Sequence, residues 1–255
     1  MKANNLKVFF METGGLYRFA IKFFKEGFLP RYEFAEFFRQ CFQIGNKTLP
    51  LAGATGFIMG IVITIQSHPS MEAFGTESWL PSVVSVSLVR EIVPVITALI
   101  CAGKIGSGIG AELGSMKVTE QIDAMEVSGT NPFKYLVVTR VFASMLMIPL
   151  LVIFSDTIAL YGAYLGVNMK QVVSFQLYTN QIFEKLTFAD VLPSIIKSFF
   201  FGFAIGIIGA YQGYYTRNGT QGVGRAANTA VVISIFVVFI IDLLAAQIAD
   251  ILHFL

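Results

Sequence analysis

Residues Val141–Val167 read VFASMLMIPLLVIFSDTIALYGAYLGV and contain one charged side chain, that of Asp156. A helix crosses the hydrocarbon layer of a bilayer with roughly 20 predominantly apolar residues, so this stretch is long enough to span a membrane. The composition of the whole chain agrees, because hydrophobic residues make up 55% of it, charged residues 13%, and the mean hydropathy is +0.69. Soluble domains carry about 25% charged residues. We therefore expect an all-α integral membrane protein.

Four further stretches have a similar length and the same scarcity of charge: Thr48–Ser70, Trp79–Gly103, Val191–Thr216 and Ala226–Ala249. Together with the first stretch, they predict a bundle of five transmembrane helices over residues 48–255. Glycines recur four positions apart in and near these stretches, at Gly56 and Gly60, at Gly106, Gly110 and Gly114, at Gly202 and Gly206, and at Gly209 and Gly213. This spacing favours close approach of helices within a membrane.

The basic residues between the stretches predict an orientation. Fourteen Lys and Arg would lie on the side of the N-terminus, in residues 1–47, 104–140 and 217–225. The other side would hold two, Lys170 and Lys185. Because cytoplasmic loops are enriched in Lys and Arg, this bias predicts a cytoplasmic N-terminus and a C-terminus on the outer side.

The first 47 residues are amphipathic rather than continuously apolar. In residues 6–28, aromatic and aliphatic side chains recur at spacings of three and four, with basic residues between them. A basic amphipathic helix rich in Phe is typical of the membrane interface. Alternatively, its apolar stripe packs on protein. We expect Pro30 to end this helix and a second short amphipathic segment, Tyr32–Ile44, to lead into the first span.

The longest cytoplasmic segment between spans, Lys104–Arg140, contains a further amphipathic pattern. We expect a helix over Met116–Val127, where apolar side chains are interleaved with charged ones. Gly129 is suited to a C-terminal stop, and Asn131-Pro132 cannot continue a helix. A helix tied to spans on both sides could dock a soluble motor and pass its motion to those spans. An ordinary surface helix fits the same residues.

Residues Val89–Pro132 read VREIVPVITALICAGKIGSGIGAELGSMKVTEQIDAMEVSGTNP. This stretch, above all the block AELGSMKVTEQIDAMEV, closely resembles the MlaE/YrbE family of ABC transporter permeases, which serve bacterial Mla and Mce lipid-transport systems and chloroplast lipid import. The resemblance covers nearly the whole chain. The chain departs from the family pattern at Ile92-Val93, where Leu-Gly is usual, and at Lys104, where Arg is common.

The resemblance implies a single permease domain over residues 1–255 that forms a homodimer in the cell inner (cytoplasmic) membrane, with a periplasmic C-terminus. It also implies three partners: an ABC ATPase subunit similar to MlaF, an MCE-domain lipid-binding protein similar to MlaD, and phospholipid as cargo. The coupling helix seated in the ATPase would include Glu112, Met116, Lys117, Thr119, Glu120, Gln121, Asp123 and Glu126.

The chain carries no ATP-binding motif of its own. The pattern GxxxxGK[ST] is absent, and Gly45-Asn46-Lys47-Thr48 lacks the glycines that cradle phosphates. We therefore expect no enzyme activity, catalytic residue, cofactor or metal site in this chain, and ATP bound by the partner subunit. Cys41 and Cys101 lie in apolar sequence without metal-ligand spacing, so we expect two buried free thiols.

Five charged residues lie within the apolar stretches: Arg90, Glu91, Asp156, Lys197 and Asp242. A charge facing lipid at the bilayer centre costs about 2.5–3.5 kcal/mol on insertion scales, so such side chains point inward and pair or face water. We expect Glu91 to pair with Lys197 and Arg90 with Asp242. These pairs would form a polar patch in an apolar cavity suited to a lipid headgroup and its tails. The alternative is structural pairing without contact to cargo.

A second class of function is an ion-coupled secondary transporter that relays protons through the intramembrane carboxylates Glu91, Asp156 and Asp242. Such transporters often contain inverted repeats, and five spans do not divide into matching halves. A membrane enzyme is favoured less, because His68 and His253 are the two histidines and no nucleophile–His–acid cluster is visible in the sequence.

Overall fold

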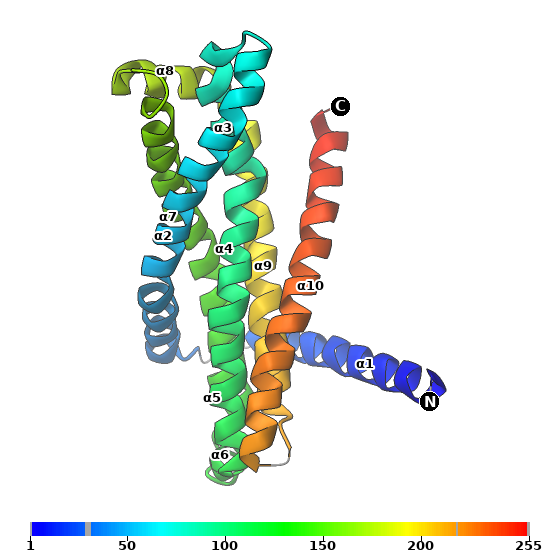
Figure 1. The fold of residues 1–255 in the computed structure, drawn as a ribbon. Coiled ribbons are helices and arrows are strands. Elements are labelled where there is room, and N and C mark those ends of the chain that lie inside the picture. Colours follow the sequence, from blue (N-terminus) through cyan, green and yellow to red (C-terminus); the bar gives the residue numbers. More distant parts are fainter. Residues whose placement is uncertain (1, 29–31, 218, 254–255) are drawn as a thin grey trace. The chain divides into compact units, whose positions relative to one another are not determined.

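The computed structural model describes residues 2–28, 32–217 and 219–253, with side chains from residue 11 to residue 251. Within these ranges the chain forms helices and no strand (Figure 1). The long helices are α1 (Lys2–Gly27), α2 (Phe34–Ala73), α7 (Thr139–Asn168), α9 (Phe188–Tyr214) and α10 (Gly219–His253). The shorter ones are α3 (Leu80–Ser87), α4 (Val93–Cys101), α5 (Ser107–Val118), α6 (Gln121–Val127) and α8 (Phe175–Lys185). The 3-10 turn η1 (Glu77–Trp79) and the π segments η2 (Leu88–Ile92), η3 (Ala102–Gly106) and η4 (Phe133–Val138) connect them.

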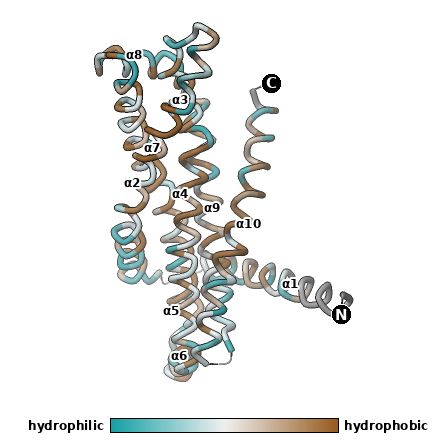
Figure 2. Tube along the Cα trace, in the orientation of Figure 1, coloured by the Kyte–Doolittle hydropathy of each residue, from teal (hydrophilic) through white to brown (hydrophobic). Residues whose placement is uncertain are grey.

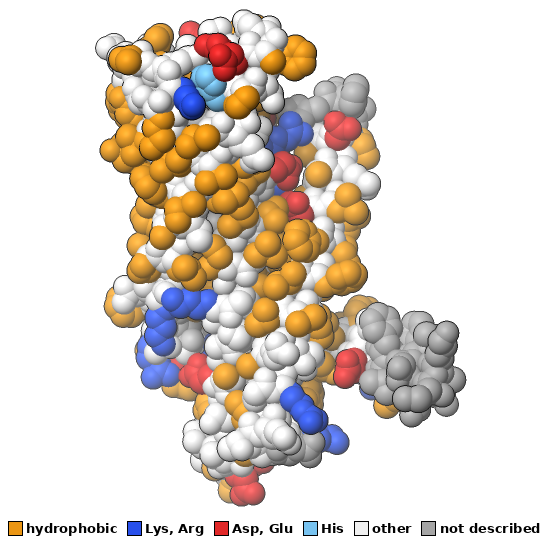
Figure 3. All heavy atoms as spheres, in the orientation of Figure 1, with side chains coloured by type: hydrophobic (Ala, Val, Ile, Leu, Met, Phe, Trp, Pro, Cys, Tyr) orange, Lys and Arg blue, Asp and Glu red, His pale blue; other side chains and the backbone are white. Residues whose placement is uncertain are grey.

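Five segments of the described chain are long and apolar enough to cross a membrane: Phe34–Ala73, Glu77–Val118, Phe133–Asn168, Phe188–Tyr214 and Gly219–Ile251. Hydrophobic residues follow much of these helices in Figure 2, and hydrophobic side chains cover much of their visible surface in Figure 3. The predicted all-α membrane fold with five spans is confirmed.

The first span begins earlier than expected. The amphipathic segment predicted at Tyr32–Ile44 is not a separate helix, because α2 starts at Phe34 and continues into the span. Near its start, Glu36 is 5% exposed and accepts hydrogen bonds from Arg39 Nη2 at 2.9 Å and from Gln40 Nε2 at 2.7 Å. These neighbours, three and four residues on, satisfy the buried carboxylate within a single helix.

The helices divide into two compact units whose boundaries fall inside the long helices. Unit 1 comprises Met1–Ile44, Ala102–Ser144 and Phe203–Ser234. Unit 2 comprises Gly45–Cys101, Met145–Gly202 and Ile235–Leu255.

In unit 1, α1 has one face packed on protein and another that is exposed. Phe19 and Phe23 are buried, and their rings contact those of Phe133, Tyr211, Phe142 and Phe203. The exposed apolar side chains of the same helix and its end are Met11, Tyr17, Ile21, Phe24 and Phe28. The alternative interpretation, that the apolar stripe packs on protein, is therefore confirmed for Phe19 and Phe23, and the interfacial position of the exposed face stays a prediction. The side chains of residues 6–10 lie outside the described part.

Two glycines show how closely the helices approach within each unit. In unit 1, a Cβ at Gly213 of α9 would lie 2.8 Å from the carbonyl oxygen of Gly110 in α5. In unit 2, a Cβ at Gly56 of α2 would lie 2.8 Å from the carbonyl oxygen of Ser155 in α7. Any side chain at these positions would collide with backbone, so the close contacts predicted from the glycine spacing are present here.

The core of unit 2 joins α3, α7 and α8. Leu80, Val84 and Leu88 pack with Ala159 and Ala163 and with residues of α8. From α8, the phenol of Tyr178 donates a hydrogen bond to the carbonyl oxygen of Leu160 at 2.9 Å. Burial raises the pKa of Tyr178 to about 12, so the phenol keeps its proton near neutral pH. This contact and the apolar core hold α8 against α7.

Candidate functional site

Three of the charges expected within the membrane meet in unit 2. Lys197 Nζ in α9 lies 2.6 Å from Glu91 Oε2 in η2 and 2.8 Å from Asp242 Oδ1 in α10. The Lys197 side chain is 3% exposed, whereas those of Asp242 and Glu91 are 21% and 41% exposed. The predicted pairing of Glu91 with Lys197 is confirmed. We refer to Glu91, Lys197 and Asp242 as the charge cluster.

The predicted pairing of Arg90 with Asp242 is wrong, because Asp242 contacts Lys197 instead. An ammonium carries three donors and can therefore serve two carboxylates at once. Arg90 is partly exposed, and it forms no ion pair with any residue that the structure describes. Neighbouring side chains of a helix point about 100° apart, so the side chains of Arg90 and Glu91 point toward different parts of the structure.

The local backbone at Glu91 is a π-helical turn. Residues Leu88–Ile92 form η2, in which the N–H of Val93 bonds to the carbonyl oxygen of Leu88. A π turn inserts one residue into the helical register, which re-aims the side chains that follow, and such turns are frequent at functional sites. Here the turn carries both Arg90 and Glu91.

The surroundings of Lys197 are acidic overall. The charge cluster has one cation and two carboxylates, which gives a formal charge of −1. A third carboxyl, that of Asp156 in α7, lies within electrostatic range of Lys197. Its Oδ1 atom is buried and has no hydrogen-bond partner. Burying an ammonium costs several kcal/mol unless it is paired, and Glu91 and Asp242 supply the opposite charges for Lys197 within the bundle.

An apolar groove of about 520 Å³ lies between α9 and α10 within unit 2. Leu192, Ile196 and Phe200 line it from α9, and Leu244 and Ile248 line it from α10. Lys197 is the one charged residue of its lining. The groove therefore combines an apolar wall with a cation that is already held by two carboxylates. A molecule with long hydrocarbon chains and a charged end matches this combination.

The helix expected over Met116–Val127 is interrupted, which corrects its predicted bounds. The segment α5 ends at Val118 and α6 begins at Gln121, and Glu120 between them has φ = 59°. The hydroxyl of Thr119 donates to the carbonyl oxygen of Ser115 at 2.9 Å, which closes the end of α5. The predicted stop after Val127 is confirmed, because Gly129 adopts φ = 80° and its N–H bonds to the carbonyl oxygen of Glu126 at 3.0 Å.

The residues expected to couple to an ATPase lie on this helix–turn–helix of unit 1. Ile122 is 1% exposed and fixes α6 to the unit. Lys117 Nζ pairs with Asp123 Oδ1 at 2.6 Å across the turn. The exposed members of the set are Glu112, Thr119, Glu120, Gln121, Asp123 and Glu126, while Met116 and Lys117 are half-buried. Val127, at the end of α6, is 91% exposed. The segment thus presents acidic and polar side chains around one protruding apolar residue.

Glu112 has a second relationship that sequence reasoning missed. Its Oε1 accepts a hydrogen bond from Arg140 Nη2 at 2.8 Å, and the Arg140 side chain is 1% exposed. Arg140 also donates from Nη1 to the carbonyl oxygen of Leu136 at 3.0 Å. The sequence places Arg140 at the end of a charged loop, but the apolar residues on either side of it, Val137, Val138 and Val141, are a signal that could have indicated its burial.

Comparison with known proteins agrees with the geometry. The family described as Permease MlaE matches residues 37–248. A probable ABC transporter permease protein of Rickettsia typhi is 40% identical over 209 residues, which cover 82% of this chain and 81% of that protein. A probable ABC transporter permease protein of Synechocystis sp. is 36% identical over 198 residues, covering 78% of this chain and 75% of that protein.

A chloroplast protein is also similar. The protein named TRIGALACTOSYLDIACYLGLYCEROL 1 of Arabidopsis thaliana is 33% identical over 204 residues, which cover 80% of this chain and 58% of that protein.

Proposed function

The chain belongs to the MlaE family of ABC transporter permeases, and from this premise we propose that it moves phospholipids or related lipids between membranes, powered by a separate ATPase. The observation that most directly supports a lipid as the cargo is the apolar groove between α9 and α10, with Lys197 as the charged residue of its lining. Acyl chains would lie along the apolar wall. The headgroup would reach the charge cluster.

The partners follow from the family and from the exposed segment of unit 1. We propose that the ATPase subunit binds ATP and docks on the turn between α5 and α6, where Glu120, Gln121 and Asp123 are exposed. A homodimer of the permease and an MCE-domain protein on the outer side complete the proposal. Both rest on the family resemblance.

The proposed location is the cell inner membrane, with the N-terminus in the cytoplasm and the C-terminus in the periplasm. Its support is the distribution of Lys and Arg, fourteen in the segments assigned to the cytoplasm against two in those assigned outside.

The experiment that tests the function reconstitutes the permease with its co-purifying subunits into liposomes that contain a fluorescent phospholipid. We expect ATP-dependent movement of that lipid to acceptor liposomes, and we expect Lys197→Ala to abolish it while the subunits still co-purify. Purification without any nucleotide-binding subunit would overturn the proposal.

The second candidate, an ion-coupled transporter, is favoured by one observation, the buried Oδ1 of Asp156 without a hydrogen-bond partner near Lys197. The same liposomes separate the two candidates. Movement driven by a proton gradient without ATP would support the ion-coupled transporter.

A further inference from the structure

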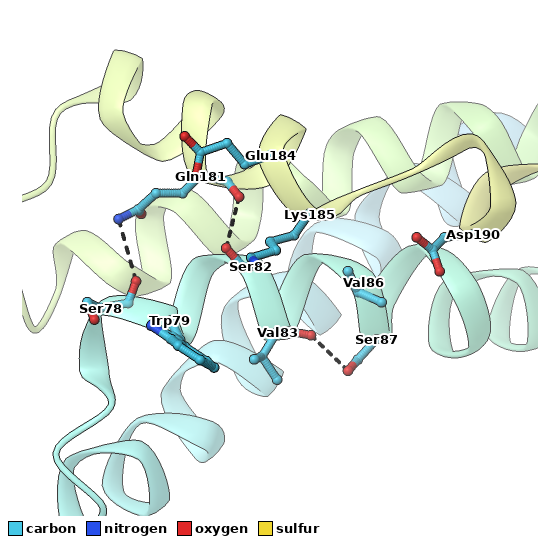
Figure 4. Close-up of a pocket in the computed structure, with 10 residues that line it drawn as sticks. All are labelled: Ser78, Trp79, Ser82, Val83, Val86, Ser87, Gln181, Glu184, Lys185 and Asp190. Carbon is cyan, nitrogen blue, oxygen red and sulfur yellow. Dashed lines mark hydrogen bonds between the residues drawn. The ribbon is translucent and has the colours of Figure 1, made fainter.

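A second pocket of unit 2 lies along α3, beside the end of α8, with a volume of about 640 Å³ (Figure 4). Three serines, Ser78, Ser82 and Ser87, line it together with Trp79, Gln181 and Lys185. Two acidic residues complete its polar lining. We call it the α3–α8 pocket. It is separate from the groove between α9 and α10, because the two share no lining residue.

Hydrogen bonds between the two helices fix the shape of the α3–α8 pocket. Ser82 Oγ donates to the carbonyl oxygen of Gln181 at 2.8 Å, and Gln181 Nε2 reaches the carbonyl oxygen of Ser78 at 3.5 Å (Figure 4). The buried phenol of Tyr178 anchors the same helix to α7. The pocket is therefore part of a packed unit rather than a gap at a loop.

Two polar groups of the pocket have no partner within the described chain. The side chain of Lys185 extends toward Ser82 in Figure 4, and it forms no ion pair with a described residue. Gln181 Oε1 is buried and accepts no hydrogen bond. A buried acceptor without a partner is destabilising, and a ligand that donates a hydrogen bond would remove this cost.

The acidic residues leave the ammonium of Lys185 available. Glu184 points away from α3 in Figure 4. Asp190 Oδ2 accepts hydrogen bonds from Thr187 N at 3.0 Å and from Thr187 Oγ1 at 2.7 Å, so it is engaged at the start of α9. The pocket thus offers a cation to an anionic group and an amide oxygen to a hydrogen-bond donor. A phosphodiester that carries an amine or a hydroxyl supplies both.

The lining of the pocket includes one exposed aromatic side chain. Trp79 lines the pocket and is 65% exposed. Amphipathic aromatic side chains such as Trp gather at the level of the lipid headgroups, where an apolar ring meets a polar layer. An exposed tryptophan in the lining therefore favours a position of the pocket at the level of the lipid headgroups.

The pocket and the charge cluster lie on the same helical segment. Lining residues recur at helical spacing from Trp79 through Val83 to Ser87, and Glu91 follows four residues later. On the other wall, Asp190 lines the pocket and Lys197 follows it by seven residues along α9, which is two turns. On both walls the Glu91–Lys197 pair therefore follows the lining of the pocket within about two helical turns.

We infer that the α3–α8 pocket binds the phosphate-bearing headgroup of a membrane lipid on its way to or from the charge cluster. The phosphate lies at Lys185, and the amine or hydroxyl of the headgroup donates to Gln181 Oε1. This inference rests on the proposed transport of lipids and adds a second headgroup site to it.

Trp79 is the one tryptophan of the chain, so its fluorescence reports on the pocket alone. The full-length chain is placed in nanodiscs that contain increasing fractions of a phospholipid with a nitroxide on its headgroup. We expect quenching of Trp79 that saturates at a low fraction of this lipid. Lys185→Gln should weaken the apparent affinity roughly tenfold, since it removes a charged hydrogen-bond partner.

The matched control is Lys170→Gln, which changes the other basic residue assigned to the outer side and does not line the pocket. It should leave the quenching unchanged, which excludes a general effect of surface charge. Quenching that rises without saturation, or that is equal in Lys185→Gln and in the unmodified chain, would overturn the site. Equal competition by inorganic phosphate and by soluble glycerophosphoethanolamine would overturn its assignment to a lipid headgroup.

The liposome assay keeps this test separate from that of the proposed function. ATP-driven lipid movement without saturable quenching would overturn the headgroup site and support the proposed lipid transport. Saturable quenching without lipid movement would support the headgroup site and contradict the proposed lipid transport.

Discussion

Glu91 Oε2 lies 2.6 Å from Lys197 Nζ although 106 residues separate the two along the chain. The ammonium that Glu91 contacts also holds Asp242 at 2.8 Å. Lys197 is therefore the centre of the cluster. The buried cation has two carboxylate partners, so neither of them is its sole partner.

This asymmetry predicts unequal effects on stability. Lys197→Ala leaves two carboxylates facing each other inside the bundle, whereas Glu91→Ala leaves the ammonium with Asp242. Removing one member of a buried ion pair typically costs about 3–5 kcal/mol, and we expect Lys197→Ala to approach that range and Glu91→Ala to fall well below it. The double variant should lose less stability than the sum of the single variants.

Thermal melting in detergent measures this double-mutant cycle without measuring transport. The control is the single variant Asp156→Asn, which changes a nearby carboxyl that forms no ion pair with Lys197 in the structure. Strictly additive losses for Glu91 and Lys197 would contradict an energetic role for their contact.

The Glu91–Lys197 pair could be predicted because an apolar bundle contains few charges, and each must find a partner. The partner of Asp242 could not, since one lysine can bind two carboxylates and the sequence does not show which of its neighbours it reaches. The spans were predictable for a related reason. Long runs without charge have one stable environment, the interior of a membrane.

Helix ends were harder to predict from the sequence. Nothing in Thr119 or Glu120 forbids a helix, and the break there depends on the left-handed backbone of Glu120. The early start of α2 depends on hydrogen bonds that satisfy Glu36, including one from the phenol of Tyr135 at 3.3 Å, 99 residues away. The α3–α8 pocket also joins distant segments, so no local pattern marks it.

A prediction for the coupling segment follows from its exposed acidic face. Glu120→Lys combined with Asp123→Lys reverses the charge of the turn between α5 and α6 and removes the Lys117–Asp123 pair. We expect the ATPase subunit to be lost on co-purification, because like charges at an interface are costly. The permease itself should still insert into the membrane, since both side chains are exposed.

The control for this variant is Glu33→Lys, an exposed acidic residue on the side assigned to the cytoplasm. It changes the net charge without touching the turn, and the ATPase subunit should remain bound. Full retention of the ATPase by the double variant, with lipid-stimulated hydrolysis intact, would show that the subunit docks elsewhere.

The orientation can be tested with single cysteines. Cys41 and Cys101 are buried and free, so a background with both changed to Ala gives no labelling of its own. In that background, Thr220→Cys should react with a membrane-impermeant maleimide from the cytoplasmic side and Gln176→Cys from the outer side. Both positions are exposed. Reaction of both from one side would contradict the model of five spans with a cytoplasmic N-terminus.

The last prediction separates two roles for Glu112, which the family resemblance assigns to the coupling set and the structure pairs with Arg140. Glu112→Ala removes the carboxylate that is hydrogen-bonded to a guanidinium 1% exposed, and leaves Glu36 within electrostatic range of that guanidinium. Removing one member of a buried ion pair costs about 3–5 kcal/mol, and we expect a loss below that range because Glu112 itself is half-exposed and Glu36 remains. The melting temperature of the permease in detergent should fall accordingly.

Glu112→Gln supplies the discriminating variant. Its amide oxygen can still accept the hydrogen bond from Arg140 Nη2, so it should recover part of the lost stability. If Glu112 acts only through Arg140, the ATPase should co-purify with Glu112→Gln as it does with the unmodified chain. Loss of the ATPase from a stable Glu112→Gln permease would instead place the carboxylate at the docking surface, and unchanged melting of Glu112→Ala would show that the contact with Arg140 contributes nothing to the fold.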